Sequence, residues 1–433
     1  MTPAHSEPRT ILGLRTDLVW GLIGVLLFIV GDGVEQAWIS PYLIERGLSM
    51  PQSATLIAIY GIAVAIGAWL SGVMAEALGP RKTMLIGAMF WLVGQVLFLL
   101  VALPTMNFAI IVPTYCIRGL GYPLFCYSFL VWVTYRNPAK TLATAVGWFY
   151  LAFTGGLYIV ANFYASLMIP VLGHVGVLWS AIVWALAGTA IVLMCVKGTV
   201  RERTTVGEQL AILLSGISII KENPRVGVGG LVRLINTTSQ FALPVFFPIY
   251  LSQHGFTTEQ WLKVWALTFT VNIAFNLIWG VVGDRIGWGR TVQIFGGFGC
   301  ACTMIFMAYA PIWFSGNYMA MLLMGSLYGA LIAGFCPLTA LVPSLEPERK
   351  GAAMSVLNLG AGLSSFVGPL LVALLFTTVG AKGVLFAFAG LYIVSIFLTS
   401  FVARDEKARF AVPKTLSTTQ SAYSAKREEN IRW

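Results

Sequence analysis

Long apolar stretches recur along this sequence and restrict the chain to one class of fold. The hydrocarbon core of a bilayer is about 30 Å thick, so an α-helix needs roughly 20 apolar residues to cross it. Charged residues make up only 10% of the chain, against about 25% in an average soluble domain. We therefore predict an all-α membrane protein whose twelve transmembrane helices occupy residues 18–42, 54–77, 83–103, 107–134, 142–169, 174–196, 226–251, 261–282, 291–313, 317–343, 351–378 and 384–403.

The distribution of Lys and Arg predicts how these helices are oriented. If the N-terminus is cytoplasmic, most of the 27 basic residues fall on the cytoplasmic side. The exceptions are three in outer loops and two within helices, namely Arg46, Lys263, Lys382, Arg118 and Arg233. Cytoplasmic loops of membrane proteins carry such an excess, so both termini are expected inside. The net charge of +10 then faces anionic lipid and indicates no nucleic-acid partner.

A shift in composition divides the chain into two halves. Residues 197–225 contain RERTTVGE and KENPR around an apolar run, 209–220, that is too short to cross a bilayer. Leu and Ile recur in that run at helical spacing, which predicts an amphipathic helix on the cytoplasmic surface. The predicted organisation is a cytoplasmic segment 1–17, a six-helix bundle 18–196, the linker 197–225, a second six-helix bundle 226–403, and a polar tail 404–433 that we expect to be disordered.

The two halves repeat a loop sequence. GVMAEALGPRK begins at Gly72 and GVVGDRIGWGR begins at Gly280, 208 positions later. The glycines allow a tight turn, the acid can face a helix end, and the basic residues can reach lipid headgroups or the other half. A repeat of this length indicates a duplicated six-helix unit. We predict a gating role for these loops, against the alternative of simple positively charged turns, with the residues Gly72, Glu76, Gly79, Arg81, Lys82, Gly280, Asp284, Arg285, Gly287 and Arg290.

Few ionisable residues lie inside the predicted helices. Each costs about 2.5 to 3.5 kcal/mol at the bilayer centre, so such residues usually pair or line a wet cavity. A rise of 1.5 Å per residue puts Asp32 roughly 21 Å and Arg118 roughly 14 Å from the inner edge. The same estimate puts Glu35 at roughly 25 Å and Arg233 at roughly 10 Å. We therefore predict that Asp32 pairs with Arg118, and that Glu35 has no arginine comfortably in reach.

This set suggests proton coupling through Asp32, Arg118 and Glu35. Beside Arg118 the carboxylate of Asp32 would stay ionised, and once the arginine turns away burial would favour the protonated form. The alternative is a static ion pair that fixes two helices. Asp32 and Glu35 are three residues apart and so should face one cavity. Glu35 could accept a substrate hydroxyl, serve as a second proton site, or be a neutral spectator.

Other polar and aromatic residues recur at helical spacing and suggest a binding site for a neutral polyol. Amides both donate and accept hydrogen bonds, which suits hydroxyl groups, and aromatic rings can cover C–H faces. The alternatives are helix-to-helix hydrogen bonds for the amides, packing for the aromatics, and an Arg233 that reaches toward the inner surface. The predicted substrate-binding residues are Glu35, Gln36, Trp38, Tyr122, Trp148, Arg233, Asn236, Gln240, Asn272, Asn276 and Asn358.

The sequence gives no sign of a cofactor, a metal site or ATP-driven transport. All six cysteines lie in apolar segments, where they act as small core residues. The three histidines fall in the N-terminal segment and outer loops with no metal-ligand spacing. No GxxxxGK[ST] loop occurs.

The chain resembles the polyol permeases of the major facilitator superfamily, the ribitol and D-arabinitol carriers of bacteria. The paired loops resemble the signature loop of that superfamily. The finer resemblance lies in GDGVEQAWIS from Gly31, IRGLGYPLFCYSF from Ile117, GWFY from Gly147, RLIN from Arg233, LKVWA from Leu262 and EPERKGAAMSVLNLGAGLSS from Glu346.

The resemblance implies proton-coupled uptake of a five-carbon sugar alcohol across the bacterial inner membrane by alternating access, with no enzymatic activity. The proline-rich motif of antiporters is absent, since Gly155 and Gly156 stand at its place with no proline beside them. We expect a monomer. Another small solute such as a hexose or sugar acid remains an alternative, as does a transporter-like sensor, although the chain adds no cytoplasmic domain beyond its short tail.

Overall fold

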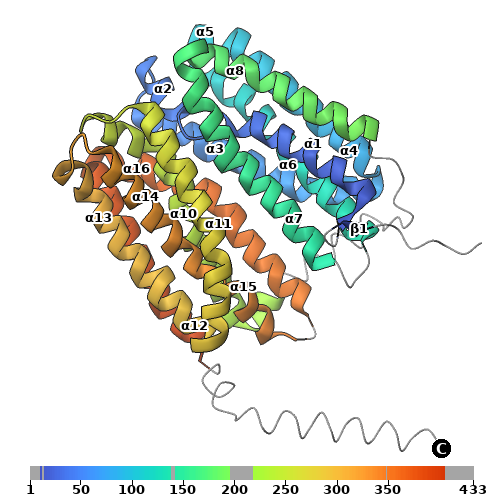
Figure 1. Ribbon diagram of the computed structural model, residues 1–433, viewed down its shortest axis with the longest axis vertical. Coiled ribbons are helices and arrows are strands. Elements are labelled where there is room, and N and C mark those ends of the chain that lie inside the picture. The colour runs from blue at the N-terminus through green and yellow to red at the C-terminus, as the bar shows by residue number, and fades with distance from the viewer. Residues whose placement is uncertain (1–9, 12–13, 138–141, 196–217, 348, 405–433) are drawn as a thin grey trace, which may run out of the picture.

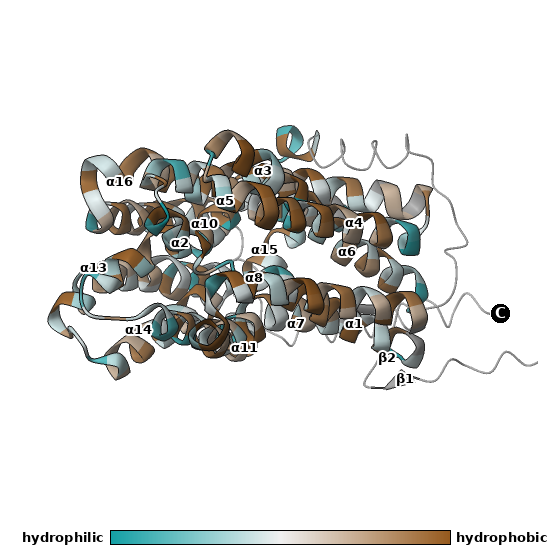
Figure 2. Cartoon of the chain, turned by 90° about the horizontal axis from the view of Figure 1, so that it is seen from above, coloured by the Kyte–Doolittle hydropathy of each residue, from teal (hydrophilic) through white to brown (hydrophobic). Residues whose placement is uncertain are grey.

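The computed structural model describes residues 10–11, 14–137, 142–195, 218–347 and 349–404, which are helical almost throughout (Figure 1). In that part of the chain, eight helical stretches are long and apolar enough to cross a membrane. Apolar residues extend along most of the helices (Figure 2). The prediction of an all-α membrane protein is confirmed.

The N-terminal half begins with a short hairpin, in which Thr10 pairs with Arg15 and Ile11 with Leu14. Helices follow, and two of them continue into π-helical segments, η1 and η2. The elements of this half are β1 (Thr10–Ile11), β2 (Leu14–Arg15), α1 (Thr16–Gly33), α2 (Ile39–Glu45), α3 (Met50–Ala77), α4 (Pro80–Leu97), η1 (Phe98–Ala102), α5 (Leu103–Thr105), α6 (Phe108–Arg136), α7 (Leu142–Thr154), η2 (Gly155–Val160) and α8 (Ala161–Cys195).

The C-terminal half lies beside the first half (Figure 1). Its elements are α10 (Pro224–Ser252), α11 (Thr258–Ile286), α12 (Trp288–Thr291), the π-helix η3 (Val292–Gly299), α13 (Cys300–Trp313), α14 (Tyr318–Ile332), the 3-10 helix η4 (Ala333–Phe335), α15 (Leu338–Leu341), the 3-10 helix η5 (Pro343–Leu345) and α16 (Lys350–Val402).

The first apolar segment, predicted as one helix over 18–42, is broken. α1 ends at Gly33, residues 34–38 form turns, and α2 begins at Ile39. Gly31 and Gly33 weaken the helix immediately before the break, since glycine costs about 1 kcal/mol relative to alanine in a helix. The break places Glu35 in a turn rather than on a helix face.

The repeat seen in the sequence has a counterpart in the structure. α3 begins with a capping box made by Ser49 and Gln52, and α11 begins with one made by Thr257 and Gln260. In each box the two residues satisfy each other's free backbone N–H group. The two helices therefore start in the same way, 208 positions apart.

The predicted loop glycines adopt the conformation that favours glycine. Gly79 has φ +90° and Gly287 has φ +107°, a region that other residues rarely enter. Gly79 separates α3 from α4, and Gly287 separates α11 from α12. The expectation of a tight glycine turn in both copies is confirmed.

Two helices bend sharply at glycines. α8 is interrupted by Gly173 with φ +67°, and α16 by Gly380 with φ +65°. Gly173 lies in the predicted gap between 142–169 and 174–196, and Gly380 lies in the gap between 351–378 and 384–403. The sequence therefore located both bends.

Hydrogen bonds join the two halves near α2. Ser40 donates from Oγ to the carbonyl oxygen of Val245 over 2.9 Å. The indole N–H of Trp261 donates to the carbonyl oxygen of Ala37, also over 2.9 Å. We call the end of the molecule that carries α2 the α2 end.

The linker and the tail lie largely outside the described residues. The predicted amphipathic helix 209–220 falls there except for its last residues, since the described residues between the linker and α10 are 218–223, of which 218–222 are helical. Residues 405–433 of the predicted tail lie wholly outside.

Candidate functional site

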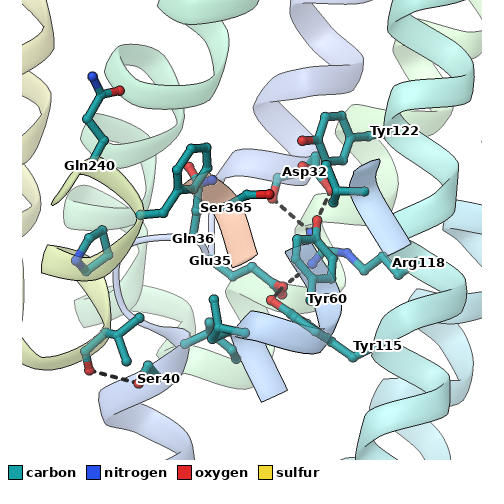
Figure 3. Close-up of a pocket in the computed structure, with 16 residues that line it drawn as sticks. Asp32, Glu35, Gln36, Ser40, Tyr60, Tyr115, Arg118, Tyr122, Gln240 and Ser365 are labelled. Carbon is teal, nitrogen blue, oxygen red and sulfur yellow. Dashed lines mark hydrogen bonds and ion pairs between the residues drawn. The ribbon is translucent and has the colours of Figure 1, made fainter. Parts of the chain in front are cut away.

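A cavity lies between the two halves. It encloses about 630 Å³ of empty space, part of it open to solvent. Side chains of both halves line it, and Gln240 of α10 lies on the opposite side from Arg118 and Tyr115 of α6 (Figure 3). The lining residues are Asp32, Glu35, Gln36, Ile39, Ser40, Ile57, Tyr60, Val64, Tyr115, Arg118, Tyr122, Gln240, Phe241, Pro244, Val245 and Ser365.

Arg118 forms the charged centre of this cavity. It is buried, with 1% of its surface exposed. α4 packs closely on α6 at this point and holds the backbone of Arg118 in place. A Cβ atom added at Gly94 would lie only 2.4 Å from the backbone nitrogen of Arg118. The guanidinium also lies over two aromatic rings, 5.2 Å from the centroid of Trp91 and 5.4 Å from that of Tyr115. Such cation–π contacts are stronger when desolvated.

Asp32 is held by Arg118 and by Trp91. Nη2 of Arg118 lies 3.1 Å from Oδ1 of Asp32 and also donates to the Asp32 carbonyl oxygen over 2.8 Å. The indole N–H of Trp91 donates to the same Oδ1 over 2.8 Å. The predicted pairing of Asp32 with Arg118 is confirmed.

Glu35 also contacts Arg118, so the expectation that no arginine reaches it is wrong. Nη1 of Arg118 donates to Oε1 of Glu35, and the hydroxyl of Tyr115 donates to the same oxygen over 2.6 Å. The depth estimate assumed a straight helix rising 1.5 Å per residue. The break after Gly33 invalidates that assumption and lets Glu35 fold back beside Asp32. Both acids line one cavity, as predicted.

Two oxygen atoms at the cavity lack hydrogen-bond partners. Oε2 of Glu35 and Oε1 of Gln36 are buried and have no donor within the described part of the chain. A buried acceptor without a partner costs about 1 to 3 kcal/mol, more if it is charged. Both oxygens are therefore suited to receive a donor from a bound solute, a water molecule or a proton.

The cavity contains some of the predicted substrate residues and several that were not predicted. Gln36, Tyr122 and Gln240 line it as predicted. Tyr115 was missed, although it stands three residues before Arg118 and therefore shares its helix face. Tyr60 and Ser365 carried no signal in the sequence, since only the packing of α3 and α16 brings them to the cavity.

The two tryptophans that were predicted to bind substrate, Trp38 and Trp148, do not line this cavity. Trp38 is buried and packs against Tyr42 and His174, with ring centroids 5.6 Å and 4.8 Å away. Its indole N–H donates to the carbonyl oxygen of Val34. Trp148, on α7, is half-buried against the hydrophobic core.

The remaining predicted polar residues of the C-terminal half also lie off the cavity wall. Asn236 is buried, accepts a hydrogen bond from Arg233 over 3.0 Å, and donates to the Ile332 carbonyl oxygen over 3.4 Å. Asn272 donates to the Gly329 carbonyl oxygen over 3.2 Å.

Asn276 and Asn358 complete this set. Asn276 donates to the backbone oxygen of Asn272 over 2.9 Å. Asn358, on α16, is exposed. Asn236, Asn272 and Asn276 thus make hydrogen bonds between and within helices, the alternative that the sequence left open.

The charged residues of the paired loops make few contacts. Arg81 donates to the carbonyl oxygen of Leu193, and Asp284 accepts a hydrogen bond from the Trp288 indole over 2.8 Å. The side chain of Glu76 lies outside the described set. Gly72 and Gly280 have open space where a Cβ would be, and Lys82, Arg285 and Arg290 are exposed.

No metal site is found among the described residues, where no three His, Cys, Asp or Glu side chains gather.

Comparisons with known proteins agree with this architecture. The sequence model of the Major Facilitator Superfamily matches residues 16–345. The chain is 44% identical to the alpha-ketoglutarate permease of Bacillus subtilis (strain 168), covering 94% of this chain and 94% of the permease. It is 36% identical to the D-arabinitol transporter of Klebsiella pneumoniae, covering 95% of this chain and 98% of the transporter.

A solved structure shares the fold at low sequence identity. The crystal structure of a D-xylose-proton symporter superposes with a TM-score of 0.65 at 16% identity, covering 88% of this chain and 96% of the symporter.

Proposed function

Because the chain belongs to the Major Facilitator Superfamily, we propose that it imports a small uncharged solute with several hydroxyl groups, such as a pentitol, together with protons. It is a transporter and not an enzyme, as are its named relatives. Transport would proceed by alternating access, in which the two halves rock about the cavity between them.

The balance of charge in the cavity carries this proposal. The lining includes two carboxylates, those of Asp32 and Glu35, and a single basic side chain, that of Arg118. With all three ionised the site has a net charge of −1, and with one proton bound it is neutral, so in neither state does it offer a net positive charge to an anionic solute. The unpaired acceptors on Glu35 and Gln36 call for donors, and hydroxyl groups supply them. The relative named as a D-arabinitol transporter supports a polyol.

A dicarboxylate is the second candidate, favoured by the 44% identity to a protein named alpha-ketoglutarate permease. A dianion could bind only if Asp32 and Glu35 were neutralised, which would free Arg118 for a bidentate contact with a substrate carboxylate. The two candidates therefore differ in the protonation that binding requires.

Coupling to protons would give such a carrier its direction. An uncharged solute moving alone only equilibrates across the membrane. One proton entering down 100 mV supplies about 2.3 kcal/mol, which supports a gradient of roughly fifty-fold. We propose that Asp32, Glu35 and Arg118 provide the coupling.

The stripe of polar residues on α10 would form part of the exit route. Arg233 and Asn236 lie seven and four residues before Gln240, on the same helix face. A solute that leaves the cavity toward the N-terminal end of α10 would pass both side chains. Trp148, Asn272, Asn276 and Asn358 are proposed to contact the solute on this route, and Trp38 when the α2 end opens.

We also propose twelve crossings, with both termini cytoplasmic and the α2 end outside. Two of the eight candidate spans, Thr144–Met194 and Ala353–Val402, hold 51 and 50 residues and each bends at a glycine, so each would cross twice. α1 with α2, and the 29-residue α10, would supply the others. The paired loops would then close the cytoplasmic side of a monomer in the bacterial inner membrane.

Uptake into proteoliposomes tests the proposal. The purified protein is given radiolabelled pentitols, hexitols and 2-oxoglutarate in turn, while a dye inside the vesicles reports pH. We expect saturable uptake of at least one pentitol with acidification of the lumen, and no competition by a tenfold excess of 2-oxoglutarate. Saturable uptake of 2-oxoglutarate without uptake of any polyol would establish the second candidate.

A further inference from the structure

The cluster around Arg118 has one negative charge too many. The guanidinium contacts both carboxylates, yet its single positive charge balances only one. Among the described residues, the other titratable groups that face Glu35 are the phenols of Tyr60 and Tyr115, which carry no charge in their usual form. Burying an uncompensated charge costs several kcal/mol. One proton would balance the cluster.

The unpaired oxygens of the two acids differ in burial. Asp32 has donors from Trp91 and Arg118 on Oδ1, and its carbonyl oxygen also accepts from Arg118. Oδ2 of Asp32 has no donor in the described part of the chain either, but it is not fully buried. Glu35 has donors from Tyr115 and Arg118 on Oε1, whereas its Oε2 is buried without a donor. An ionised acid is stabilised where its oxygens accept hydrogen bonds. Glu35 is therefore the acid whose unpaired oxygen is fully buried.

The two acids also lie in different backbone elements. Asp32 lies within α1, while Glu35 lies in the turn between α1 and α2. Hydrogen bonds from Ser40 and Trp261 fasten the neighbouring α2 region to the other half. When those bonds part, the turn can move and carry Glu35 with it, while Asp32 stays with α1.

We propose, building on the proposed function, that Glu35 rather than Asp32 carries the transported proton, one per cycle, on Oε2. Asp32 remains ionised and holds Arg118 in position. The proton comes from water on the α2 side when that end is open and forms an O–H bond at Oε2. The same O–H bond breaks when the opposite side opens, and the proton passes to water there.

The test compares Glu35→Gln with Asp32→Asn in proteoliposomes. The probe is radiolabelled D-arabinitol, and the readout is the ratio of protons to solute taken up, which is independent of how fast each variant works. We expect a ratio near one for the wild type and below one tenth for Glu35→Gln. Asp32→Asn should transport at least tenfold more slowly, with its ratio still near one.

Two further variants keep the test decisive. Glu35→Asp restores an acid on a shorter side chain and should recover more than half of the wild-type ratio. Glu45→Gln removes an exposed acid at the end of α2 and should leave both rate and ratio unchanged. If Asp32→Asn yields no folded protein, comparing Glu35→Gln with Glu35→Asp still shows whether Glu35 carries the proton.

The outcomes separate this inference from the function on which it rests. A wild type that moves D-arabinitol without protons, or that moves no pentitol, contradicts the proposed function. A wild type that moves both, with an unchanged ratio in Glu35→Gln, overturns only the assignment to Glu35.

Discussion

Trp91 of α4 and Asp32 of α1 are joined by a hydrogen bond of 2.8 Å from the indole N–H to Oδ1. The same indole lies under the guanidinium of Arg118, 5.2 Å from its ring centroid. A cationic group and an anionic group thus both contact one aromatic side chain, which is not among the residues that line the cavity. Trp91 is a positioning residue for the charged cluster.

Replacing Trp91 with Phe should weaken this cluster. The change removes the donor to Asp32, and a hydrogen bond to a charged group is worth about 1.5 to 3 kcal/mol. We expect uptake to fall about tenfold, with its pH profile displaced because Asp32 loses a donor. The control Trp179→Phe alters an exposed tryptophan. Equal uptake and equal pH profiles in the two variants would exclude the positioning role.

Replacing Gly94 with Ala should separate α4 from α6. The new Cβ would lie 2.4 Å from the backbone nitrogen of Arg118, and overpacking of this kind costs about 1 to 3 kcal/mol. We expect a lower melting temperature in detergent and a loss of uptake. Gly147→Ala is the control, because nothing lies within 4 Å of its Cβ position. Similar melting temperatures in both variants would contradict the predicted clash.

Replacing Gly79 or Gly287 with Ala should strain the paired loops. Their φ angles of +90° and +107° cost a residue with a side chain about 1 to 3 kcal/mol. Space is not the cause at Gly79, which has nothing within 4 Å of its Cβ position. We expect both variants to melt earlier than Gly72→Ala, in which the new Cβ is also free of contacts. The melting temperatures of the three variants, measured by thermal unfolding in detergent, test this prediction.

Removing the contacts at the α2 end should favour opening there. Ser40→Ala with Trp261→Phe deletes two hydrogen bonds between the halves, each worth about 0.5 to 1.5 kcal/mol. In a cysteine-free background with Gln240→Cys in the cavity, a membrane-impermeant maleimide applied from the α2 side should react about tenfold faster.

The control for this opening is Ser252→Ala, which removes a hydroxyl that donates to the carbonyl oxygen of Ile249 in the same helix. If the double variant reacts no faster than this control, the two bonds do not hold the α2 end closed.

The sequence predicted features that depend on local composition. Apolar length identified the membrane class, and the gaps between the predicted helices located the bends in α8 and α16. The offset of 208 residues identified two loops that turn alike at Gly79 and Gly287. The depth estimate also paired Asp32 with Arg118 correctly, because α1 is continuous up to Gly33.

The same estimate failed for Glu35 because it could not include the break that follows. Where the chain leaves the helix, the rise per residue no longer measures depth, and side-chain direction depends on the packing around the turn. The amides on α10 and α11 show a related limit. Helical spacing shows which residues share a face, but whether that face meets a cavity or a neighbouring helix depends on the other helices.

The sequence alone therefore determined that this chain crosses a membrane, that its halves repeat, and that Asp32, Glu35, Arg118 and Arg233 are ionisable residues within apolar segments. These properties depend on the number and spacing of residues along one chain. Only the tertiary structure decided that Arg118 contacts both acids, that Tyr115 and Trp91 supply the remaining donors, and that Oε2 of Glu35 has none. Such contacts arise where helices distant in sequence approach closely, as α4 and α6 do at Gly94, and no local pattern encodes that distance.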